Sequence, residues 1–115
     1  MIADKTATIE SLRNEICKEG PGRLFSDTEY SNFFNGTHYS RIAARLLAKK
    51  IIGETLPELR DFRKLTILSG DFGQPILVPD TEYHEMIRNS GIRAIRLSLS
   101  HSRNYARAVV HFEYA

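Results

Sequence analysis

Apolar residues recur every three or four positions in two segments of the chain. Near the N-terminus, Ile9, Leu12 and Ile16 share one helical face, and we expect this helix to end at the glycines and proline of residues 20–22. A second, longer helix is predicted to begin between Thr37 and Ser40 and to end at Gly53 as its C-cap. Its buried stripe comprises Ile42, Ala43, Leu46, Leu47, Lys50 and Ile51.

Between these helices lies the start signal of a third, short helix. Ser26 is followed three residues later by Glu29, the spacing of a capping box. We expect this helix to carry Tyr30 and the phenylalanines at 33 and 34, and Asn35 and Gly36 to end it.

The period changes to two in the second half of the chain. Residues 65–68 and 76–78 are short apolar runs around the turn-rich segment 70–75, which predicts a hairpin. Asp80 is placed to cap a helix through Ile87 that ends at Gly91.

Two further strands follow, around residues 95–99 and 106–112, where apolar and polar residues alternate on either side of a polar loop at residues 100–104. The pattern predicts an α+β domain in which one long helix packs on an antiparallel sheet.

Composition narrows the class of protein. A chain of 115 residues with 42% hydrophobic and 26% charged residues has the balance of one globular domain, which we expect to span residues 1–115. The single Cys17 excludes an internal disulfide, and no apolar run reaches the length needed to span a bilayer. Because the first ten residues have no apolar core like that of a signal peptide, we expect a soluble cytoplasmic protein that does not bind a membrane.

The net charge of +2 conceals an uneven distribution of charge. Two long stretches, residues 30–53 and 86–112, contain several basic residues and no Asp or Glu. If the fold joins them, they form an electropositive surface suited to phosphates, whereas the alternative is scattered, solvated charges. These cations are Arg41, Arg45, Lys49 and Lys50 in the first stretch and Arg88, Arg93, Arg96, Arg103 and Arg107 in the second.

Candidate chemistry is most concentrated at Ser98, Ser100, His101 and Ser102. A hydrolase is disfavoured because neighbouring strand residues point to opposite faces and no nucleophile elbow is present. Hydroxyl groups and an imidazole at a strand end are suited to binding a phosphate, although a polar hairpin loop is an equally simple explanation. Dispersed histidines give no zinc-type spacing. Nucleic acid is a rival ligand, but the chain has no RNP-like aromatic run and no zinc-finger spacing, and we expect no nucleic-acid partner.

Four motifs occur in order between residues 24 and 113. They are FSDTEYSNF at residues 25–33, RIAARLLAKKIIG at 41–53, GQP at 73–75, and SLSHS at 98–102 followed by YA at 105–106 and AVV at 108–110. In this order and spacing they resemble the motifs of the holo-acyl-carrier-protein synthase family of phosphopantetheinyl transferases.

The resemblance implies a small α+β subunit that transfers 4'-phosphopantetheine from coenzyme A to a serine of an acyl carrier protein, with magnesium, in fatty acid or polyketide biosynthesis. It also implies a homo-oligomer, with a trimer favoured and sites between subunits. Both partners are anionic, which agrees with the basic stretches. The expected coenzyme A site comprises Arg41, Arg45, Lys49, Lys50, Gly73, Pro75, Ser98, Ser100 and His101.

Three positions depart from the family pattern. The family's metal-binding glutamate is replaced by Leu46, and Arg45 stands where the family has lysine. An ungapped match puts Lys5 at the family's metal-binding aspartate, and a shift of one residue would recover Asp4, the one candidate for a metal ligand or catalytic acid. Two hypotheses follow: an active transferase, or a catalytically inactive homologue that binds coenzyme A, a carrier protein or a partner subunit.

Overall fold

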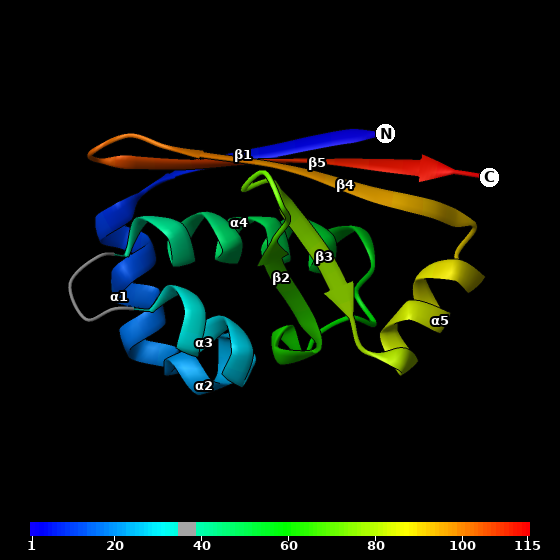
Figure 1. The fold of residues 1–115 in the computed structure, drawn as a ribbon, viewed down its shortest axis with the longest axis horizontal. Helices are drawn as coiled ribbons and strands as arrows, with labels where there is room; N and C mark the ends of the chain where they lie inside the picture. Colours follow the sequence, from blue (N-terminus) through cyan, green and yellow to red (C-terminus); the bar gives the residue numbers. More distant parts are fainter. Residues whose placement is uncertain (35–38) are drawn as a thin grey trace.

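The computed structural model describes residues 1–34 and 39–115, and places a three-stranded antiparallel sheet over a long central helix (Figure 1). The sheet has the order β1-β5-β4, with β1 at Ile2–Thr8, β4 at Ile92–His101 and β5 at Tyr105–Tyr114. The helix α4, Ser40–Thr55, lies along one face of this sheet. This arrangement confirms the expected α+β fold.

A second, two-stranded sheet crosses α4, and its turn reaches the first sheet, where β3 contacts β4 (Figure 1). Its strands β2, Leu65–Ser69, and β3, Pro75–Pro79, pair antiparallel and confirm the predicted hairpin. The remaining elements are α1 (Ile9–Glu19), α2 (Pro21–Leu24), α3 (Asp27–Phe33), the 3-10 turn η1 (Phe62–Lys64) and α5 (Thr81–Asn89).

The predicted helix starts are confirmed in their hydrogen bonds. The Ser26 hydroxyl accepts from the Glu29 backbone N–H at 3.3 Å, and the Glu29 carboxylate accepts from the Ser26 N–H at 3.0 Å. Asp80 caps α5 by accepting from the Tyr83 N–H at 2.9 Å. The expected stop at Asn35 and Gly36, and the possible start at Thr37, lie outside the described residues.

The prediction that Gly53 ends the long helix is wrong. Helix α4 continues to Thr55, and Leu56 is its C-cap. Gly53 lies inside the last turn, where a Cβ would come within 3.2 Å of the Phe62 ring. Its lack of a side chain therefore allows the segment after α4 to pack closely against the helix.

Helix α4 is covered on nearly all sides. Every residue from Ile42 to Lys49 is buried, because the sheet and α1 pack on α4. In addition, α2, α3 and β2 contact its Arg45 and Lys49 side chains. From β5, alternate residues face the helix: Ala106, Ala108, Val110 and Phe112 are at most 1% exposed. Within the described part of the chain, no helix is long and apolar enough to cross a membrane.

Candidate functional site

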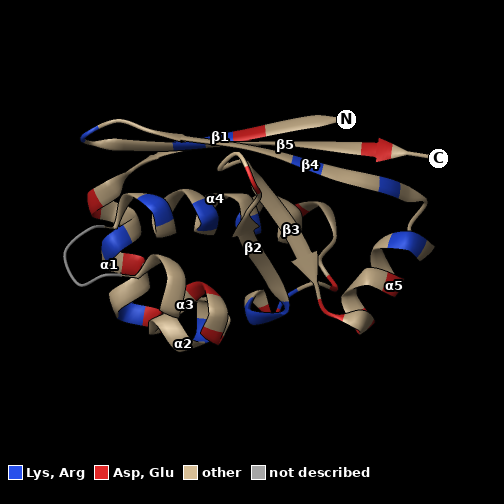
Figure 2. Cartoon of the chain, viewed as in Figure 1, with Lys and Arg blue, Asp and Glu red and all other residues tan. Residues whose placement is uncertain are grey.

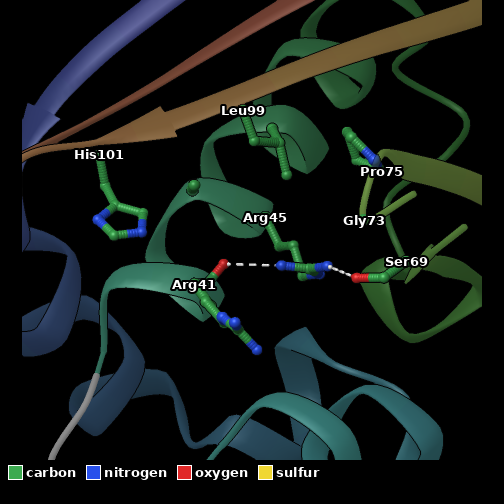
Figure 3. Close-up of a pocket in the computed structure, with 8 residues that line it drawn as sticks. Arg41, Arg45, Ser69, Gly73, Pro75, Leu99 and His101 are labelled. Carbon is green, nitrogen blue, oxygen red and sulfur yellow. Dashed lines mark hydrogen bonds between the residues drawn. The ribbon is translucent and has the colours of Figure 1, made fainter. Parts of the chain in front are cut away.

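A pocket of about 380 Å³ opens where the N-terminal half of α4, the end of the β2-β3 hairpin and the end of β4 meet (Figure 3). This volume is within the range of small-molecule sites. Two guanidinium groups, an imidazole and a hydroxyl line it, and none of its lining residues carries a carboxylate among the residues that the structure describes. The lining residues are Arg41, Ala44, Arg45, Ser69, Gly73, Pro75, Leu99 and His101. The pocket is thus suited to an anion.

The hairpin wall of the pocket is held by its turn. Gly73 has a φ of 80°, a conformation that glycine adopts readily, and its N–H donates to the Gly70 carbonyl at 3.0 Å. The Gly70 N–H in turn donates to the Gln74 carbonyl at 2.7 Å. The structure therefore places Gly73 and Pro75 beside the pocket.

Arg45 lies at the base of the pocket in a fixed orientation. Its Nε donates to the Ile67 carbonyl at 3.0 Å, Nη1 to the Arg41 carbonyl at 3.3 Å, and Nη2 to the Ser69 hydroxyl at 3.2 Å (Figure 3). The guanidinium also stacks 3.6 Å from the centre of the Phe33 ring. Because a guanidinium has five N–H donors, these bonds leave donor capacity for a ligand.

Lys49 does not belong to the pocket, although the expected coenzyme A site included it. Its side chain is fully buried, and Nζ donates to the Glu29 carboxylate at 2.5 Å and to the Leu24 and Phe62 carbonyls, each at 2.9 Å. An ammonium has three N–H donors, so all of them have acceptors inside the protein. Arg41, Arg45 and Lys49 recur at every fourth residue of α4, yet they do not form one exposed edge, since α2, α3 and η1 cover Lys49.

Lys50, Ser98 and Ser100 are also separate from this pocket. Lys50 pairs with Glu15 of α1 at 2.6 Å and lines a different groove, near the end of α4. Ser98 and Ser100 alternate with Leu99 along β4 and are exposed on the opposite face of the sheet. One chain therefore joins Arg41, Arg45, Gly73, Pro75 and His101 of the predicted set, and not the other four residues.

The two acid-free stretches pack together, with α4 against β4 and β5 (Figure 2). Their charges nevertheless do not form one surface. Arg96 and Arg107 lie on the outer face of the sheet, where they pair with Glu113 at 3.3 Å and Asp4 at 3.1 Å. The cations of the sheet and those of α4 therefore lie on different faces of the protein. Among the described residues, the basic side chains that line the pocket are Arg41, Arg45 and His101.

The metal-binding positions implied by the resemblance do not fit magnesium in this chain. Leu46 is fully buried and its side chain has no oxygen atom that could bind a metal ion. The Lys5 ammonium pairs with Glu54 at 2.9 Å. Asp4 is on the outer face of the sheet, away from the pocket. In residues 1–34 and 39–115 no three His, Cys, Asp or Glu side chains form a cluster that could hold a metal ion.

Ser69 and Glu29 are two residues whose importance sequence analysis missed. Ser69 ends β2 without any motif of its own, and its contact with Arg45 depends on how β2 packs. Glu29 was recognised as a capping residue, which accounts for one of its two carboxylate oxygens only. The other oxygen accepts from the Ile67 N–H at 3.0 Å, a contact between residues 38 positions apart.

Burial of the Lys49 ammonium lowers its pKa from 10.5 to about 8, although the charge of Glu29 opposes this shift. Between these two values the unfolded chain binds a proton that the folded chain does not. The Lys49 contribution therefore makes the free energy of unfolding rise as the pH increases from about 8 towards 10.5. Urea denaturation at several pH values should show this rise, relative to a Glu29→Gln/Lys49→Met variant that lacks the group. An equal pH slope in both proteins would contradict it.

Fold and site together define the class of protein: a small α+β domain with a cationic pocket between a long helix and two sheets. Two relatives agree over nearly the whole chain. A holo-[acyl-carrier-protein] synthase of Vibrio campbellii is 32% identical in an alignment that covers 93% of this chain and 91% of the relative. One of Fusobacterium nucleatum is 30% identical, with 94% and 93% covered. The chain belongs to the holo-[acyl-carrier-protein] synthase family.

Solved structures confirm the fold. The Neisseria meningitidis holo-[acyl-carrier-protein] synthase superposes with a TM-score of 0.83 at 21% identity, covering 97% of this chain and 96% of that one. The Helicobacter pylori enzyme, solved in complex with coenzyme A, superposes with a TM-score of 0.77 at 18% identity, covering 98% and 100%. No protein-family model matches the chain.

Proposed function

We propose that this protein is a phosphopantetheinyl transferase that moves 4'-phosphopantetheine from coenzyme A to a serine of an acyl carrier protein. Similarity to holo-[acyl-carrier-protein] synthases over nearly the full length supports the reaction. The observation that carries the assignment to this site is the cationic pocket, because Arg41, Gly73, Pro75 and His101 of the family-like motifs meet there with Arg45.

The residues of the pocket are suited to hold the nucleotide end of coenzyme A. Arg45 supplies an oriented guanidinium, while the more exposed Arg41 can adjust to the ligand. His101 can donate a hydrogen bond to a phosphate oxygen. In the transfer, the carrier serine oxygen bonds to the phosphorus next to pantetheine and the bond from that phosphorus to the bridging oxygen breaks. The products are the modified serine and adenosine 3',5'-bisphosphate. The cations stabilise the charge of the departing phosphate, and water accepts the serine proton.

A second function, binding without transfer, is favoured by one specific observation. Leu46 and Lys5 stand at the positions where the family resemblance implies magnesium ligands, and neither can bind a hard cation. An inactive homologue would retain the cationic pocket and bind coenzyme A, an acyl carrier protein or a partner subunit. We propose a homo-oligomer in either case, with a trimer favoured by the resemblance.

Incubation with coenzyme A and several apo carrier proteins, with and without Mg²⁺, separates these functions. We expect mass spectrometry to show phosphopantetheine on a carrier serine, and calorimetry to show coenzyme A binding. Arg41→Ala and His101→Ala should each weaken binding by about tenfold or more, because each loses a hydrogen bond to a charged phosphate.

Arg88→Ala and His84→Ala are the matched controls, since both residues lie in α5 and outside the pocket. Binding without mass addition to any carrier would establish the second function. If coenzyme A does not bind the folded protein, the proposed transferase is wrong, and of the second function only binding of an acyl carrier protein or a partner subunit remains.

A further inference from the structure

Glu29 is a fully buried carboxylate beneath the pocket, outside its lining. Oε1 accepts from the Ser26 N–H at 3.0 Å and from Lys49 Nζ at 2.5 Å, and Oε2 accepts from the Ile67 N–H at 3.0 Å. A helix cap requires only the first of these bonds. The other two reach into α4 and β2, the elements that carry Arg45 and Ser69 to the pocket.

The Ile67 peptide groups connect Glu29 with Arg45. The Ile67 N–H donates to Glu29, and the carbonyl of the same residue accepts from Arg45 Nε at 3.0 Å. Two residues further along β2, the Ser69 hydroxyl accepts from Arg45 Nη2 at 3.2 Å. The position of β2, and therefore of two acceptors that orient the Arg45 guanidinium, depends on the bond to Glu29.

Glu29 also provides negative charge for two buried cations. Arg45 and Lys49 are four residues apart on α4, hence one helical turn, and they are 5% and 0% exposed. Burial lowers the pKa of both groups, and the charge of Arg45 lowers the pKa of Lys49 further. The charge of Glu29 opposes these shifts at both groups. Without Glu29, turning the Arg45 guanidinium out to water would relieve both its burial and its repulsion from Lys49.

We propose that Glu29 is a positioning residue that holds the Arg45 guanidinium in the orientation that binds the phosphates of coenzyme A. Glu29 acts through the Ile67 peptide and through its charge, without contact to the ligand. The proposal rests on the proposed function for its ligand, while the position of Arg45 can be measured without any ligand.

Glu29→Gln tests this role, because an amide has one acceptor oxygen in place of two and no charge. We expect coenzyme A affinity, measured by calorimetry on the folded protein, to fall by about tenfold or more. Solvent exchange of the Arg45 Nε–H, followed by NMR without ligand, should accelerate by a similar factor as its bond to Ile67 is lost. Glu82→Gln is the matched control, since Glu82 is also paired with a lysine but is exposed.

A Glu29→Gln/Lys49→Met variant provides the second test, because it buries no unpaired Lys49 charge. We expect it to unfold at a higher temperature than Lys49→Met and still to bind coenzyme A about tenfold more weakly than the wild type. An exchange rate of the Arg45 Nε–H equal to that of the wild type, in either folded variant, would overturn the proposal. Wild-type coenzyme A affinity would do the same. If the wild-type protein itself does not bind coenzyme A, the proposed function fails, and the exchange measurement alone decides whether Glu29 positions Arg45.

Discussion

Lys49→Met is expected to lower the free energy of unfolding by about 3–5 kcal/mol, the usual cost of removing one partner of a buried ion pair. Methionine has nearly the length of lysine, so the change removes charge and hydrogen bonds with little change in volume. Glu29 then remains in the interior without its cation, and the Leu24 and Phe62 carbonyls lose the donor they share. Urea denaturation at pH 7 measures the difference.

Two comparisons separate the ion pair from general effects of the substitution. Lys64→Met removes an exposed lysine from its pair with Glu82 and should change stability little. Adding Glu29→Gln to Lys49→Met removes the unpaired carboxylate and should restore part of the lost stability. A Lys49→Met protein no less stable than Lys64→Met would show that the buried pair contributes nothing.

Leu46→Glu is expected to lower the free energy of unfolding by about 4 kcal/mol or more, since it removes a core leucine and buries a carboxyl group. Leu46 is fully buried among the apolar residues of α4 and the sheet. The nearest acid of β1, Asp4, is on the opposite face of the sheet. Although the resemblance places a metal-binding glutamate here, the substitution is not expected to create a magnesium site.

Leu46→Met provides the control, with an expected loss below about 1.5 kcal/mol because it keeps the volume and the apolar character. Urea denaturation and thermal unfolding with and without Mg²⁺ are the measurements. If Leu46→Glu were as stable as the wild type and unfolded at a higher temperature with Mg²⁺, a metal site would exist at this position.

Local sequence patterns were sufficient for most elements of the fold. The capping box of Ser26 and Glu29, the Asp80 cap and the hairpin around Gly73 depend on residues within a few positions of one another. The end of α4 was predicted wrongly because glycine is typical of a helix C-cap. Gly53 instead lies inside α4, where its lack of a side chain leaves space for the ring of Phe62, nine residues further along the chain. Strand β1 carries too few large apolar residues for its period to be recognised, and the sequence pattern did not predict it.

The candidate site was predicted in part for the same reason. Arg41, Gly73, Pro75 and His101 occur in motifs, and the fold brings them together with Arg45. Lys49 was included in the expected site because cations at every fourth residue share one helix face that could bind an anion. That spacing contains no information about Glu29, which is 20 positions away and pairs with Lys49. Side chains alternate between the two faces of the sheet along β4. Ser98 and Ser100 therefore lie away from the pocket, although they are close in sequence to His101, which lines it.

By itself, the sequence determined the α+β class, the positions of most helices and strands, and the family, since periodicity, caps and ordered motifs are local properties. Only the tertiary structure decided which cations face a ligand and which are buried in the protein. That outcome depends on which elements cover each side of α4. Arg41, Arg45 and Lys49 have the same charge and the same spacing, yet they are respectively exposed, oriented at the base of the pocket, and enclosed with Glu29.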